Sequence, residues 1–171
     1  MDFFKVINER RSVRTFTGKP VEAEKLQKIL ETANAAPSAG NLQGYEIYLV
    51  TKVEQRTALV KAAHNQEFIA DAAVTLVFCA NPARSVERYK ERGIRLYAVQ
   101  DATIACTYAM LTCVALGLAT VWVGAFEEDA VRHAVGIPPE LIPVAMLPIG
   151  YAGKKPGTTS RRALRDLVHK A

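Results

Sequence analysis

The chain has 171 residues, half of them hydrophobic, which suits a single domain with a buried core over residues 1–171. Its apolar stretches are interrupted by polar residues, and no basic segment followed by an apolar block opens it, so we expect a cytoplasmic protein without signal peptide or membrane span. The net charge of +5 is concentrated at residues 10–19, 84–95 and 154–170, which suits a compact anionic ligand at least as well as a nucleic acid.

Hydrophobic periodicity divides the chain into helices and strands. The run at 73–80 is apolar at nearly every position, which is typical of a strand covered on both faces. Residues 82–95 are polar and charged, and their structure is the part that the pattern predicts least. In chain order, the expected elements are helices over 2–9 and 21–33, a loop over 37–41, a strand over 45–51, a helix over 53–63, a strand over 73–80, a helix over 98–116, a strand over 120–125, a helix over 127–135, a strand over 144–150 and a basic helix from residue 162.

Helices that cover a small sheet on both sides imply an α+β fold built as a three-layer α/β/α sandwich. The helix over 98–116 is apolar almost all round and ends at Gly117, a residue suited to a helix C-cap. A monomer of this size leaves one side of such a helix uncovered. We therefore expect that side to meet an identical helix across a two-fold axis, giving a homodimer.

The cysteines and histidines favour neither disulfides nor a metal site. Cys79, Cys106 and Cys113 lie in apolar runs without CxxC spacing. The last two are about 10.5 Å apart along a helix, at 1.5 Å per residue, which is beyond the reach of a disulfide. We expect three reduced, packed thiols, and no metal because the three histidines lack ligand spacing.

A basic cluster, Arg10-Arg11-Ser12-Val13-Arg14, interrupts the apolar pattern behind the first helix. Arginine offers a planar fork of donors that fits a phosphate, and a neighbouring serine adds a short donor. The same residues are also typical of a solvated, positively charged helix end. By itself the cluster leaves both interpretations open.

Five segments carry short motifs in a fixed order. They are RRSVR at 10–14, APSAGNLQ at 36–43, a long helix from 98 that ends in ALGL at 115–118, VWVGAF at 121–126, and PIGY at 148–151 followed by SRRAL at 160–164. Each motif is weak alone, but together they resemble the nitroreductase family of FMN-dependent oxidoreductases over nearly the whole chain. The resemblance implies a mainly antiparallel or mixed central sheet and a homodimer with FMN at its interface.

The resemblance implies a role for each polar residue of the cluster. Arg10 and Ser12 would lie near the phosphate and ribityl chain of FMN. Arg14 would point toward the N1–C2 carbonyl edge of the flavin, where a fixed cation stabilises the negative charge of the reduced ring. Arg11 would contribute mainly through its backbone or a surface contact.

A second set of implied contacts comes from the loop after the second helix. Pro37, Ser38, Ala39 and Asn41 match the family loop that approaches the flavin from the other subunit. Small residues permit close backbone approach, and an asparagine can both donate and accept at the polar edge of the ring. The composition alone indicates an ordinary surface turn.

The remaining implied contacts are scattered along the chain. Gly124 and Ala125 match the segment whose backbone N–H faces flavin N5, although a glycine there also fits a bend at a strand end. Gln66 would reach the pyrimidine edge. Arg161 would close on the phosphate, a role that Arg162 could share.

The chain departs from the family pattern at two points. Many relatives follow the asparagine loop with Gln-Pro-Trp, whereas this chain has Gln43-Gly44-Tyr45. The chain also lacks room for the extra helices that longer members fold over the flavin. We therefore expect a more open pocket, which leaves the substrate undecided.

The resemblance implies an FMN-dependent oxidoreductase. It would take hydride from NADH or NADPH through flavin N5 and pass it to an electron-poor acceptor, such as a nitroaromatic or quinone, in a ping-pong cycle. No catalytic side chain is expected because the chemistry belongs to the cofactor. Two alternatives stay open: a flavin carrier or sensor with little turnover, and, more remotely, a basic nucleic-acid-binding protein. The sequence does not distinguish the acceptor or the nicotinamide donor.

Overall fold

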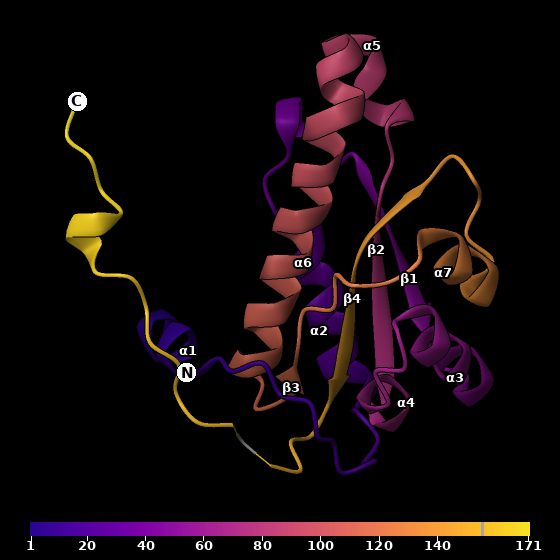
Figure 1. The fold of residues 1–171 in the computed structure, drawn as a ribbon, viewed down its shortest axis with the longest axis vertical. Coiled ribbons are helices and arrows are strands. Elements are labelled where there is room, and N and C mark those ends of the chain that lie inside the picture. The colour runs from indigo at the N-terminus through magenta and orange to yellow at the C-terminus, as the bar shows by residue number, and fades with distance from the viewer. Residues whose placement is uncertain (155) are drawn as a thin grey trace.

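The computed structural model describes residues 1–154 and 156–171, and these form three layers (Figure 1). Within the described residues the middle layer is a four-stranded antiparallel sheet in the order β1-β2-β4-β3. The strands are β1 (Tyr45–Val50), β2 (Val74–Ala80), β3 (Ala119–Thr120) and β4 (Ile142–Gly150). The helices that cover the sheet are α2 (Ala23–Asn34) and α6 (Ala98–Ala115) on one face, and α3 (Val53–Ala62), α4 (Phe68–Asp71) and α7 (Glu128–Val135) on the other. The expected α+β class is confirmed.

The sheet has a separate core on each face because the side chains of β2 alternate in direction. Leu76 and Phe78 belong to the core that includes residues of α2 and α6. Val77 and Cys79 belong to the core that includes residues of α3, α4 and α7. Every residue of β2 is buried, which confirms the prediction of a strand covered on both faces.

The long apolar helix is α6, and its C-terminus has the predicted glycine. Gly117 has a φ of 75°. Its N–H donates to the carbonyl of Val114, and the N–H of Leu118 donates to the carbonyl of Cys113 at 2.8 Å. These bonds satisfy carbonyls of the last turn that would otherwise lack partners.

Residues 83–95 are largely helical, with a break at Lys90, whose φ is 51°. They form α5 (Ala83–Arg92), which a π-helical turn, Gly93–Tyr97, continues into α6. By length and composition alone, the stretch Ala83–Ala115 is long and apolar enough to cross a membrane. The central helix of a folded core passes the same test, and α6 packs here against α2, β2 and β4.

The strand predicted at 120–125 is shorter in the structure. β3 ends at Thr120, and pairing with β4 recurs at an isolated bridge between Val123 and Met146. Continued by one residue, the register of β3 on β4 would place Val121 opposite Pro148, which has no N–H to donate. The proline therefore interrupts the ladder.

The basic helix predicted from residue 162 is wrong. Residues 156–171 are exposed, and the tail contains a 3₁₀ turn, Leu164–Asp166 (yellow in Figure 1). The apolar side chains of Leu167 and Val168 are more than half exposed. Among the described residues, these side chains have no close cover, and a helix this short is not stable without packing.

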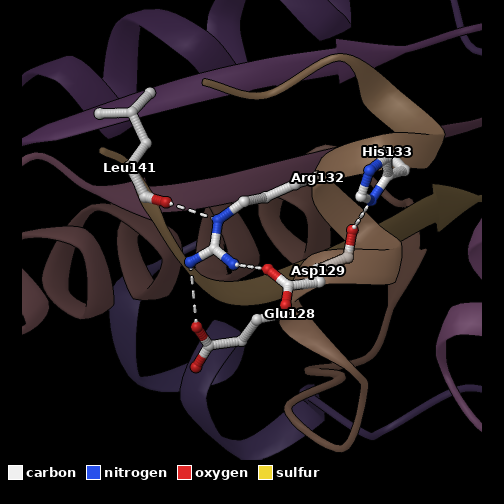
Figure 2. Close-up of polar contacts among 5 residues, drawn as sticks. All are labelled: Glu128, Asp129, Arg132, His133 and Leu141. Atoms are coloured by element: carbon white, nitrogen blue, oxygen red, sulfur yellow. Dashed lines mark hydrogen bonds and ion pairs between the residues drawn. The ribbon is translucent and has the colours of Figure 1, made fainter. Parts of the chain in front are cut away.

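Arg132 ties α7 to the segment that precedes β4 (Figure 2). Its Nε donates to the carbonyl of Leu141 at 3.0 Å, and its terminal nitrogens donate to Asp129 at 2.6 Å and Glu128 at 3.2 Å. Nδ1 of His133 lies 2.7 Å from the carbonyl oxygen of Asp129. These contacts therefore hold the segment that leads into β4 against α7. His133 contacts only the backbone of its own helix in this cluster.

The three cysteines are buried free thiols, as predicted. Burial in apolar surroundings raises the pKa of Cys79 to about 12. Burial likewise raises the pKa of Cys106 and Cys113. Because the thiolate is the reactive form, these side chains are packing groups at neutral pH.

Candidate functional site

The basic cluster at 10–14 is an extended segment at the edge of the sheet. The N–H of Val13 donates to the carbonyl of Thr120 at 3.1 Å, and Ser12 forms a parallel bridge with the same residue. Side chains alternate in direction along an extended segment. Val13 accordingly turns into the protein and is buried, which leaves Arg10, Ser12 and Arg14 on the other face.

A cavity of about 580 Å³ lies beside this face, and both ends of the chain line it. It brings the predicted residues of the cluster together with the predicted Arg161 of the tail. Among the described residues that line it, four carry a guanidinium group and none is acidic. They are Ile7, Asn8, Arg10, Arg11, Ser12, Arg14, Pro156, Gly157, Thr158, Thr159 and Arg161. This donor set fits a phosphate or another compact anion.

The arginines near the cavity are held in different ways. Arg11 donates from Nη1 to the carbonyls of Asn8 at 2.7 Å and Arg10 at 2.8 Å, so it caps the end of α1 (Phe3–Glu9). Arg161 donates to the hydroxyl of Thr159 at 2.8 Å. Arg162 donates to the carbonyl of Asp166 in the tail turn and does not line the cavity.

The predicted loop at 37–41 is held by a residue that sequence reasoning missed. Asp101 of α6 accepts hydrogen bonds from the N–H groups of Ala39 at 2.9 Å and Gly44 at 3.1 Å. Ser38 accepts a bond from the N–H of Gln43 at 3.0 Å through its hydroxyl. A lone carboxylate inside an apolar helix was the available signal for Asp101.

Within one chain, this loop and the cavity lie at opposite ends of β2. The basic cluster joins the sheet at Thr120, in line with Val74 at the start of β2. The loop leads into Tyr45, which pairs with Ala80 at the end of β2. A seven-residue strand spans roughly 20 Å, so one chain keeps these two groups of predicted residues apart. Pro37 and Asn41 are both exposed.

The structure brings two other predicted residues together. Gln66 donates from Nε2 to the carbonyl of Ala125 at 3.2 Å. Gly124 and Ala125 are exposed on the segment between β3 and α7. A Cβ on Gly124 would lie 2.9 Å from Nε1 of Trp122, so a side chain at this position would force the indole to shift. Trp122 itself packs against the core beneath α2 and α6.

Known proteins resemble this chain in sequence and in fold. The sequence model of the Nitroreductase family matches residues 7–66 and 55–151. The chain is 31% identical to the NAD(P)H-type FMN reductase of Bacillus subtilis, covering 91% of this chain and 69% of that protein. It is 28% identical to the NADH dehydrogenase of Thermus thermophilus, with 94% and 91% covered. It superposes on the NADPH:FMN oxidoreductase from Vibrio harveyi complexed with NAD⁺ with a TM-score of 0.89 at 27% identity, covering 98% of this chain and 76% of that one. This chain belongs to the nitroreductase family.

Proposed function

We propose that the protein is an FMN-dependent NAD(P)H oxidoreductase and that the arginine-lined cavity holds the phosphate end of FMN. The observation that carries the proposal is the meeting of Arg10, Ser12 and Arg161 around one space without an acidic neighbour among the described lining residues. The names of the three relatives given above contain FMN, NADH or NADPH, which agrees with a flavin-dependent oxidoreductase.

Different residues of the chain would contact different parts of FMN. Arg10 and Ser12 hold the phosphate and the ribityl chain, and Arg161 covers them from the tail. Arg14 lies on the same face as a fixed cation for the N1–C2 edge of the ring. FMN held there would supply the redox chemistry, a hydride transfer from NADH or NADPH to an electron-poor acceptor such as a quinone or nitroaromatic.

We propose further that a second copy of the chain completes the site. Pro37, Ser38, Ala39 and Asn41 would reach the flavin from the partner, since roughly 20 Å of sheet separates them from the cavity in their own chain. An apolar groove of about 540 Å³ between α1 and α6 supports the association. Phe3 and Tyr108 line it with 64% and 38% of their surface exposed. Exposed apolar patches of this kind mark interaction surfaces.

An absorption spectrum of the purified protein tests the cofactor. The two absorption bands of oxidised flavin are expected, together with NADH or NADPH oxidation on addition of menadione. Parallel lines in double-reciprocal plots at several menadione concentrations are expected for a ping-pong cycle. A flavin spectrum without turnover would leave a carrier or sensor. Colourless protein that binds duplex DNA in a salt-dependent way would contradict the proposal.

A further inference from the structure

Asp101 is a buried carboxylate that accepts hydrogen bonds from both ends of the loop between Ala39 and Gly44. It is 2% exposed and lies in the first turn of α6. Oδ1 accepts from the N–H of Ala39 and Oδ2 from the N–H of Gly44, so each oxygen serves a different end of the loop. Hydrogen bonds to an ionised group are stronger than neutral ones, and leaving a buried charge unpaired is costly.

The loop that Asp101 grips has an unfavourable backbone. The non-glycine residues Asn41 and Gln43 have φ values of 58° and 44°. Only glycine adopts this region without a steric cost, and such conformations persist where surrounding contacts enforce them. Arg84 adds one such contact by donating from Nε to the carbonyl of Leu42 at 2.9 Å.

Gly44 belongs to the same arrangement. A proline at this position would have no N–H to donate to Asp101. A Cβ on Gly44 would lie 2.7 Å from the hydroxyl oxygen of Ser85 and 3.1 Å from Oδ2 of Asp101. The hydrogen bond therefore excludes proline at this position, and the close approach of Ser85 and Asp101 leaves no room for a larger side chain without a shift.

We propose that Asp101 is a positioning residue for the flavin. It fixes the loop that carries Ser38 and Asn41 in its binding conformation before the cofactor arrives, and it acts through the backbone N–H groups of Ala39 and Gly44 rather than by touching the flavin. The inference rests on the proposed function, because it assigns the loop to the flavin site. Because the loop is already ordered, flavin binding loses little conformational entropy in ordering it.

The substitution Asp101→Asn tests this assignment, because asparagine keeps the shape but offers one acceptor oxygen in place of two. We expect faster amide exchange at Ala39 and Gly44 in the flavin-free protein and a roughly tenfold weaker affinity for FMN. The affinity of the arginine-lined cavity for inorganic phosphate should stay unchanged, since Asp101 does not line it. Thr103→Val is the matched control on α6, because its hydroxyl bonds within the helix to the carbonyl of Val99.

Several outcomes would overturn the inference. One is wild-type FMN affinity in Asp101→Asn, and another is unchanged amide protection at Ala39 and Gly44 in that variant. A parallel loss of phosphate affinity would instead indicate that the variant does not fold. If the variant does not fold, the flavin-free wild type decides: unprotected amides at Ala39 and Gly44 would show that the loop is not fixed in advance. Wild-type protein that binds phosphate but not FMN would instead contradict the proposed function.

Discussion

At the scale of single residues, arginines from the two ends of the chain meet in one cavity and should contribute separately to flavin affinity. We expect Arg10→Ala and Arg161→Ala each to weaken FMN binding by about 1.5–3 kcal/mol, the usual worth of a hydrogen bond to a charged group. That range corresponds to a roughly ten- to hundredfold higher Kd, which quenching of flavin fluorescence measures directly.

Arg165→Ala is the matched control for these variants. Its side chain is in the same tail, lies 3.6 Å from the carboxylate of Asp166 and does not line the cavity. It removes the same charge from the chain without removing a proposed contact. Unchanged affinity in both Arg10→Ala and Arg161→Ala would show that the cavity does not hold the phosphate.

Glu22 should make stability depend on acid pH. The hydroxyl of Tyr151 donates to its carboxylate at 2.7 Å, and this bond is the main reason why the pKa of Glu22 falls from 4.5 to about 2. A carboxyl with a depressed folded pKa stabilises the native state above its unfolded pKa, and this stabilisation is lost as the pH falls through the folded pKa.

We therefore expect Glu22→Gln to lower the urea midpoint at neutral pH. The difference from wild type should shrink as the pH falls from 4.5 to 2. Glu24→Gln changes an exposed carboxyl in the first turn of the same helix and serves as the control. A difference for Glu22→Gln that does not change with pH would contradict the role assigned to the Tyr151 bond.

At the scale of elements, the end of α6 offers a clean test of backbone strain. Gly117 has a positive φ, and a Cβ placed on it would meet no atom within 4 Å. Gly117→Ala should therefore cost about 1–2 kcal/mol of unfolding free energy, through the backbone alone. Gly157→Ala, also without neighbours but without a positive φ, should leave urea unfolding unchanged.

The elements also show what a sequence can and cannot predict. Helix α6 and strand β2 were predictable because burial and hydrophobic pattern agree within each segment. The early end of β3 was not, because it depends on Pro148 in another strand. The tail from residue 162 has a helix-like composition but no surface to pack on within one chain.

In the candidate site, too, some residues were predictable from local sequence and others depend on tertiary contacts. Arg10, Ser12 and Arg14 form a contiguous motif, so the sequence alone could indicate an anion site. Thr158 and Thr159 line the cavity only because the two ends of the chain meet there. Asp101 contacts Gly44 from 57 residues away, a separation that no local pattern contains.

At the scale of the whole molecule, the sheet separates two groups of residues that one cofactor would need. The cavity lies at one end of β2 and the loop of Asn41 at the other. Asn41 is exposed at the surface, and the groove between α1 and α6 is lined by apolar residues. A two-fold pair would bring the loop of one copy toward the cavity of the other while covering this groove. Assembly and flavin binding should then be coupled.

That coupling gives a sharp prediction. Tyr108→Glu places a charge in the groove, so we expect a monomer by size-exclusion chromatography with light scattering, and loss of bound flavin at the same protein concentration. Leu49→Glu, a charge at a similarly exposed apolar residue of β1 that does not line the groove, should remain a dimer with its flavin. A Tyr108→Glu monomer that retains FMN at wild-type affinity would show that each chain holds its cofactor alone.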